Sequence, residues 1–106
     1  MISLPEPIQF VWDTGNQNKN WKKHGVTAKE AEEVFINEPL LFLDDTKHST
    51  DEKRHHVLGH TNIQRRLFIA VTVRDDFIRI ISARDMSKKE RRVYEKAEKI
   101  EEAARI

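Results

Sequence analysis

Large aliphatic side chains recur at every second position from Leu67 to Val73, and this pattern constrains the fold more than any other part of the chain. The series is Leu67, Ile69, Val71 and Val73. Because successive side chains of a β-strand point to opposite faces, the segment is predicted to be a strand with one face in a core. Asp75-Asp76 predicts a turn, and Phe77–Ala83 predicts a strand that returns beside the first. We therefore expect an antiparallel hairpin whose apolar face needs a helical cover.

The N-terminal residues predict a short strand followed by a polar helix. Residues 1–7 contain proline and are expected to be a loose tail, whereas Ile8–Trp12 is typical of a strand. Asp13 is a suitable N-cap, because its carboxylate can accept hydrogen bonds from the free amides of a first turn. The helix is expected to end at about His24, where Gly25 can adopt the left-handed conformation that stops a helix.

A second helix and two further strands follow. Thr27 and Glu30 have the spacing of a capping box, which marks a helix start. The apolar stripe of this helix is Ala28, Ala31, Val34 and Phe35. Asn37-Glu-Pro39 ends it, and strands are predicted over Leu40–Leu43 and Glu52–Leu58.

The C-terminal segment predicts a helix opened by a second capping box, Ser87 with Glu90. Its apolar seam is Val93, Ala97, Ile100 and Ala104. We expect this seam to pack on the chain's own sheet, with Tyr94 also in the core. The full order is β-α-α-β-β-β-β-α, an α+β fold with a mostly antiparallel sheet, two N-terminal helices and one C-terminal helix. Residues 1–106 are expected to form a single domain.

Charge is distributed unevenly along the chain. Its 19 basic and 18 acidic residues give a net charge of +1. Residues 1–51 carry five Lys/Arg and nine Asp/Glu, whereas residues 52–106 carry fourteen and nine. This asymmetry is typical of a protein that binds a polyanion, although an ordinary solvated surface remains an alternative.

Composition also bears on cellular location, disulfide bonds and metal binding. The chain has no cysteine, so no disulfide framework is expected, and the absence of a signal peptide or membrane span predicts a cytoplasmic protein without a membrane partner. Five histidines are present, but their spacing is poor for zinc, so neither a metal site nor a cofactor is expected. His55, His56 and His60 are interpreted as strand and loop residues without a role.

The element order, with basic residues on the sheet, resembles the RelE/ParE toxin architecture. Several sequence blocks resemble more closely the BrnT family of type II toxin–antitoxin ribonucleases. They are Phe10-x-Trp12-Asp13, Asn20-x-x-Lys23-His24-Gly25-Val26, His48-Ser49-x-x-Glu52-x-Arg54, Leu58-Gly59, Arg66-Leu67, Arg79-Ile80-Ile81-Ser82-Ala83-Arg84 and Glu90-Arg91-x-x-Tyr94-Glu95. The chain departs from the family pattern at Asn16, where a lysine is common, and at Arg65, where a glycine is common. The second departure adds a cation beside Arg66.

The resemblance implies an endoribonuclease that arrests growth by cutting RNA. It also implies a cognate antitoxin of the BrnA type, which binds DNA and represses the operon together with the toxin.

RNA can be cleaved without a metal when the 2′-hydroxyl of the substrate attacks the neighbouring phosphorus. Cations that stabilise the phosphorane are predicted from the matched blocks, and these are Arg54, Arg66, Arg79 and Arg84. Glu52 is the candidate general base, because it lies on the same strand face as Arg54. Lys23 and His24 are candidates for RNA binding, and His24 could also act as an acid or base. Arg79 and Arg84 can share a face only if the strand ends or bulges between them.

Two other readings stay open. A RelE/ParE-like module could bind its target, such as gyrase, without cutting RNA. Alternatively, the basic residues of the sheet could serve only to bind an acidic antitoxin. In each case the same arginines would serve binding and not catalysis.

Overall fold

The computed structural model describes residues 8–12, 14–44, 53–74 and 77–104. Some expectations fall outside the described residues. They concern the tail 1–7, the N-cap Asp13, His48-Ser49, Glu52 and the turn Asp75-Asp76.

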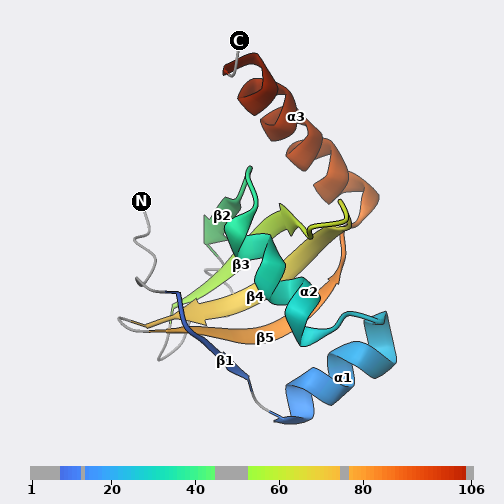
Figure 1. Cartoon of the computed structure of the whole chain (residues 1–106), viewed down its shortest axis with the longest axis vertical. Helices are drawn as coiled ribbons and strands as arrows, with labels where there is room; N and C mark the ends of the chain where they lie inside the picture. Colours follow the sequence, from blue (N-terminus) through green and yellow to red (C-terminus); the bar gives the residue numbers. More distant parts are fainter. Residues whose placement is uncertain (1–7, 13, 45–52, 75–76, 105–106) are drawn as a thin grey trace.

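The described residues form a sheet with helices around it (Figure 1). The elements are β1 (Phe10–Trp12), α1 (Thr14–His24), α2 (Ala28–Glu33), the 3-10 turn η1 (Val34–Ile36), β2 (Leu41–Asp44), β3 (Arg54–His60), β4 (Arg66–Val73), β5 (Ile78–Asp85) and α3 (Lys88–Ala104). The strand order is β1-β5-β4-β3-β2, with β1 parallel to β5 and the other pairs antiparallel. This mixed sheet confirms the predicted α+β fold class.

The local signals at the helix ends work as the sequence predicts. Gly25 has a φ of 63°, the left-handed conformation that ends α1. Thr27 and Glu30 exchange both hydrogen bonds of a capping box at the start of α2. At the start of α3, the Ser87 amide donates to the Glu90 carboxylate and the Glu90 amide donates to the Ser87 hydroxyl, at 2.8 and 3.2 Å.

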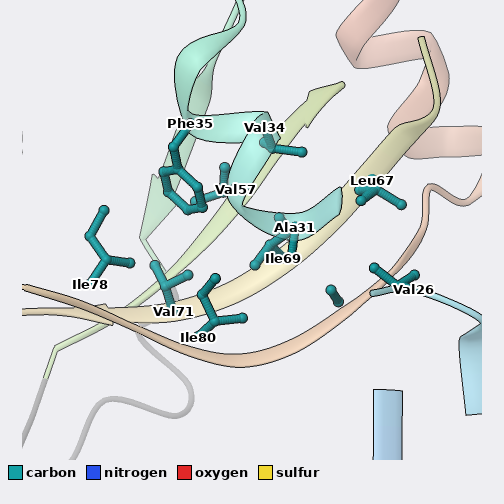
Figure 2. Packing of buried hydrophobic residues seen from close by; sticks show 11 residues of the cluster. Val26, Ala31, Val34, Phe35, Val57, Leu67, Ile69, Val71, Ile78 and Ile80 are labelled. Atoms are coloured by element: carbon teal, nitrogen blue, oxygen red, sulfur yellow. The ribbon is translucent and has the colours of Figure 1, made fainter. Parts of the chain in front are cut away.

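The apolar face of β4 is covered by α2 and η1. Figure 2 shows their side chains packed over β3, β4 and β5. This core contains Val26, Ala31, Val34, Phe35, Val57, Leu67, Ile69, Val71, Ile78, Ile80 and Ala83. The approach between η1 and β3 is close, because a Cβ at Gly59 would collide with Cγ1 of Val34. Glycine therefore allows η1 to lie directly on the sheet.

The predicted packing of the C-terminal helix is wrong. Val93 is 44% exposed and Ile100 is 72% exposed, so the apolar seam does not face the sheet. Tyr94 is fully buried instead, and its hydroxyl donates to the Pro39 carbonyl at 2.7 Å. The same hydroxyl lies 2.7 Å from Nδ1 of His60. Neighbouring helix positions differ by about 100° around the axis. With Tyr94 buried against the sheet, the apolar seam that begins at Val93 therefore points away from the sheet and toward solvent.

Tyr94 belongs to a second, smaller cluster on the sheet face opposite α2. Its buried members are Leu58, Met86 and Tyr94, with Leu41 and Phe68 packed against them. Only the N-terminal part of α3 is held in this way, and the helix extends beyond the sheet toward the C-terminus (Figure 1). The N-terminal part of α3 thus packs on the sheet face opposite α2, while α2 covers the other face.

Candidate functional site

The face of the sheet opposite α2 carries all four arginines that were predicted to stabilise the phosphorane, and we call it the basic face. Its arginines are Arg54, Arg66, Arg79 and Arg84. Strand pairing arranges its side chains in rows across β3, β4 and β5. The rows are Arg54–Thr72–Arg79, His56–Ala70–Ser82 and Leu58–Phe68–Arg84, with His60–Arg66 at the end near α3.

A β-bulge places Arg79 and Arg84 on this same face. The pairing of β4 with β5 shifts between Ala70 and Val71, because Val71 pairs with Ile80 whereas Ala70 pairs with Ser82. Ile81 is the extra residue, and it reverses the alternation of β5 beyond this point. The bulge that the sequence requires for Arg79 and Arg84 to share a face is therefore present.

The first row places two arginines on either side of a small residue. Arg79 is exposed and makes no ion pair within the described part of the chain. Arg54 is half-buried, and Thr72 between them is 6% exposed. Beside Arg79 lies a hollow of about 210 Å³, lined by Val11, Trp12, Arg74, Phe77 and Arg79. This end of the basic face can accept an anion without first breaking an ion pair of Arg79.

Arg84 is fixed in place by the Phe68 ring, by Glu90 and by the Asp85 carbonyl, to which it donates at 3.1 Å. Its guanidinium lies 4.0 Å from the centre of the Phe68 ring, and it donates to both carboxylate oxygens of Glu90 at 2.8 and 3.0 Å. Burial acts to raise the pKa of Glu90, but the hydrogen bonds from Arg84 and from the Ser87 amide outweigh it and the pKa is lowered. Glu90 is thus held as a carboxylate against Arg84.

Arg66 is also paired with α3. It donates to Glu95 at 3.1 Å and to Glu98 at 2.7 Å. Carboxylates of α3 therefore neutralise Arg66 and Arg84, whereas Arg79 remains available at the other end of the basic face.

The structure places Lys23 and His24 at the C-terminal end of α1, which packs along β5. Lys23 is exposed, and the backbone carbonyl of His24 accepts a hydrogen bond from Arg65, which also binds Asp85. Asp85 alternates with Arg84 along β5, so His24 approaches the sheet from the side of α2. Glu52 lies outside the described residues.

Arg65 has a structural role, whereas from the sequence we interpreted it only as an additional cation beside Arg66. Its side chain donates to Asp85, to Glu30 and to the backbone carbonyls of His24 and Gly25, at 2.8 to 3.1 Å. The hydrogen bond with Asp85 raises the pKa of Arg65 and lowers that of Asp85. No local pattern signals this role, because the four partners come from distant segments.

A larger hollow of about 660 Å³ lies at the α3 end of the basic face, between α3 and the segment after η1. It is lined by Ile36, Asn37, Glu38, Pro39, His60, Gln64, Glu98, Glu101 and Glu102. Its four carboxylates would repel a polyanion. No group of three or more His, Asp or Glu among the described residues is arranged to hold a metal ion, and no helix there is long and apolar enough to cross a membrane.

Comparison with protein families decides the affiliation. Residues 12–90 match the family described as the ribonuclease toxin BrnT of type II toxin–antitoxin systems. The chain belongs to the BrnT family. No match was found among curated proteins. A crystal structure of the Brucella abortus ribonuclease toxin BrnT is similar in fold, with a TM-score of 0.55 and 21% identity over 74% of this chain and 96% of that one.

Membership of the BrnT family confirms the resemblance found in the sequence blocks. The family is one of ribonuclease toxins, and a type II system pairs the toxin with an antitoxin. The matched region contains β2 to β5 and the first turn of α3, so it includes all four arginines of the basic face.

Proposed function

We propose that the protein cleaves RNA through the substrate's own 2′-hydroxyl, without a metal ion, and thereby inhibits translation and growth. The observation that carries the proposal is the row Arg54–Thr72–Arg79, in which two guanidinium groups flank a small side chain on the basic face. A phosphodiester seated over Thr72 would have a cation on each side. Fixed cations aimed at the developing charge of a phosphorane lower the barrier, and each is worth roughly 10²–10³-fold in rate.

The reaction needs a base and an acid in addition to these cations. A base takes the 2′-hydroxyl proton, the oxygen attacks phosphorus, and an acid protonates the 5′-oxygen that leaves. Glu52 remains our candidate base, since it lies two residues before Arg54 along the chain. Lys23 and His24 lie at the end of α1 on the side of α2, so they are proposed to contact RNA that extends past the edge of the sheet, beyond the cleaved bond.

The test is cleavage of a purified RNA by the purified toxin in EDTA. We expect cleavage to persist, with products that end in a 2′,3′-cyclic phosphate or a 3′-phosphate, because attack by the 2′-oxygen leaves the phosphate on that side. Cleavage that EDTA abolishes and Mg²⁺ restores would overturn the metal-independent mechanism.

A binding module without RNA chemistry is the second candidate, and the pairing of Arg66 and Arg84 with carboxylates of α3 favours it. Two of the four cations, Arg66 and Arg84, are then already neutralised. They could bind RNA or another partner only by giving up their carboxylates on α3. The cleavage experiment separates the candidates, because a gyrase-binding or antitoxin-docking protein leaves the purified RNA intact.

We propose further that a BrnA-type antitoxin lays an acidic or amphipathic segment across the basic face and competes with RNA there. Binding should then weaken as salt rises, because the contacts are between exposed charges. A variant with Arg66, Arg79 and Arg84 all changed to Glu should lose the antitoxin in a pull-down with the purified partner. Undiminished binding would place the inhibitory contact elsewhere.

A further inference from the structure

The middle of the basic face carries a strip of small side chains, Ala70, Thr72 and Ser82 on β4 and β5. We call this strip the floor, and we call the band of the face between the longer side chains the trough. Longer side chains stand along its two sides, with Arg54 and His56 on β3 and Arg79 and Arg84 on β5. Directly paired positions on neighbouring strands lie about 5 Å apart, so one phosphate group over the floor is within reach of both sides.

Thr72 is an unusual member of the floor. It is 94% buried, and its hydroxyl oxygen makes no hydrogen bond within the described part of the chain. Leaving a buried hydroxyl unsatisfied costs about 1–3 kcal/mol, so such groups are rare, and a water, an ion or a ligand is the usual missing partner. The hydroxyl belongs to the row between Arg54 and Arg79 but has almost no exposed surface. It can donate to a phosphate oxygen when a neighbouring long side chain of the row moves aside.

The three histidines of β3 differ sharply in what surrounds them. His55 lies on the side of α2, where it contacts Asp44 at 3.1 Å, and His60 is buried against the Tyr94 hydroxyl. His56 is half-buried beside the trough, and its ring centre lies 4.7 Å from that of Phe68. Phe68 is in turn held under Arg84, so the imidazole stands against a fixed surface.

The described charged groups near His56 on this face are arginines, and the carboxylate of Glu90 is paired with one of them, Arg84. Arg54 precedes it by two positions on β3, and Arg79 and Arg84 stand on the other side of the trough. These cations can neutralise a phosphorane but cannot readily give up a proton, since arginine stays charged at any working pH. A histidine can carry and release a proton near neutral pH. His56 is therefore suited to the acid step that the arginines cannot perform.

We propose that His56 is the general acid of the cleavage reaction and that the Thr72 hydroxyl holds the scissile phosphate on the floor of the trough. This inference rests on the proposed ribonuclease function. The 2′-hydroxyl proton goes to the base, the bond from the 2′-oxygen to phosphorus forms, and the bond to the 5′-oxygen breaks. His56 delivers its proton to that 5′-oxygen, and solvent later returns the base and the histidine to their starting states.

The test uses two RNA substrates that differ in one atom. In the second substrate sulfur replaces the bridging 5′-oxygen, and a thiolate leaves without being protonated because its conjugate acid is far stronger than an alcohol. His56→Gln should cleave the ordinary RNA roughly 10²–10⁴-fold more slowly than the wild type. With the sulfur substrate, the variant should cleave at close to the wild-type rate.

Two results would overturn the assignment of His56. One is an ordinary rate for His56→Gln on the oxygen substrate, and the other is an equal loss on both substrates by a variant whose circular dichroism matches the wild type. A wild-type protein that cleaves neither RNA would instead refute the proposed function itself. The failure of the two proposals is therefore distinguishable.

The role of Thr72 has its own pair of variants. Thr72→Val keeps the shape but removes the hydroxyl, whereas Thr72→Ser keeps the hydroxyl. We expect Thr72→Val to raise KM or lower kcat by about tenfold, the effect of one lost hydrogen bond to a charged group. Thr72→Ser should restore the wild-type constants. Equal activity of the valine variant, or equal defects in both variants, would remove Thr72 from the site.

Discussion

Arginines of the same hairpin have different roles, structural or, as we propose, ligand-binding, and these roles follow from the partners that each side chain has. Arg65 is bound on every side by the carboxylates of Asp85 and Glu30 and by two backbone carbonyls. Arg79, on β5, is exposed and has no such partner in the described part of the chain. Sequence alone gives both residues the same charge and the same propensity. Only the folded chain shows that Arg65 joins α1, α2 and β5, while Arg79 faces solvent.

We predict that Arg65→Ala lowers the free energy of unfolding by about 2 kcal/mol or more, because it strands two carboxylates and two carbonyls of the fold. Arg79→Ala is the matched control and should change stability by less than about 0.5 kcal/mol, as expected of an exposed site. Urea denaturation of both variants measures the difference. A loss for Arg65→Ala that is no greater than for Arg79→Ala would show that the Arg65 contacts are not stabilising.

The orientation of α3 shows where sequence patterns stop being sufficient. The spacing of Val93, Ala97, Ile100 and Ala104 correctly indicates an apolar helical stripe, but it does not say which side of the helix meets the sheet. Tyr94 decides that, since its ring fills the cluster with Leu58 and Met86 and its hydroxyl finds the Pro39 carbonyl. Contacts of this kind join residues far apart in the chain, so a local pattern cannot reveal them. Capping boxes are local, and both were predicted correctly.

The start of α3 should make the stability of the protein depend on acid. The pKa of Glu90 is lowered from its ordinary value of 4.5, so its stabilising contribution is complete above that value and is lost as pH falls through the lower, folded-state pKa. We predict that the free energy of unfolding of the wild type falls as pH goes from about 6 to about 3. In Glu90→Gln the fall should be smaller.

The control for this prediction is Glu102→Gln, which changes an exposed carboxylate near the other end of the same helix. Chemical denaturation at a series of pH values compares the three proteins. The prediction fails if Glu90→Gln and Glu102→Gln have the same pH dependence as the wild type.

At the scale of the whole molecule, the acidic residues of α2 and the arginines of the strands lie on different faces of the sheet. The helix that covers the core, α2, contains Glu30, Glu32 and Glu33, whereas the opposite face carries the four arginines. Because carboxylates of α3 pair with Arg66 and Arg84, the end of this face with Arg79 is the part that can attract a polyanion. The charge of each segment was readable from the sequence. The convergence of Arg79 and Arg84 was not, because it depends on the bulge at Ile81.

The central claim is that RNA is cut on the basic face, and one comparison tests it most directly. The cleavage rate of a short RNA in EDTA is measured for the wild type, Arg79→Ala and Lys29→Ala, since Lys29 is an exposed cation of α2 in the opposite layer. We predict that Arg79→Ala slows cleavage by about 10²-fold or more and that Lys29→Ala changes it by less than about twofold. Equal rates for Arg79→Ala and the wild type, or an equal loss in the two variants, would contradict the claim.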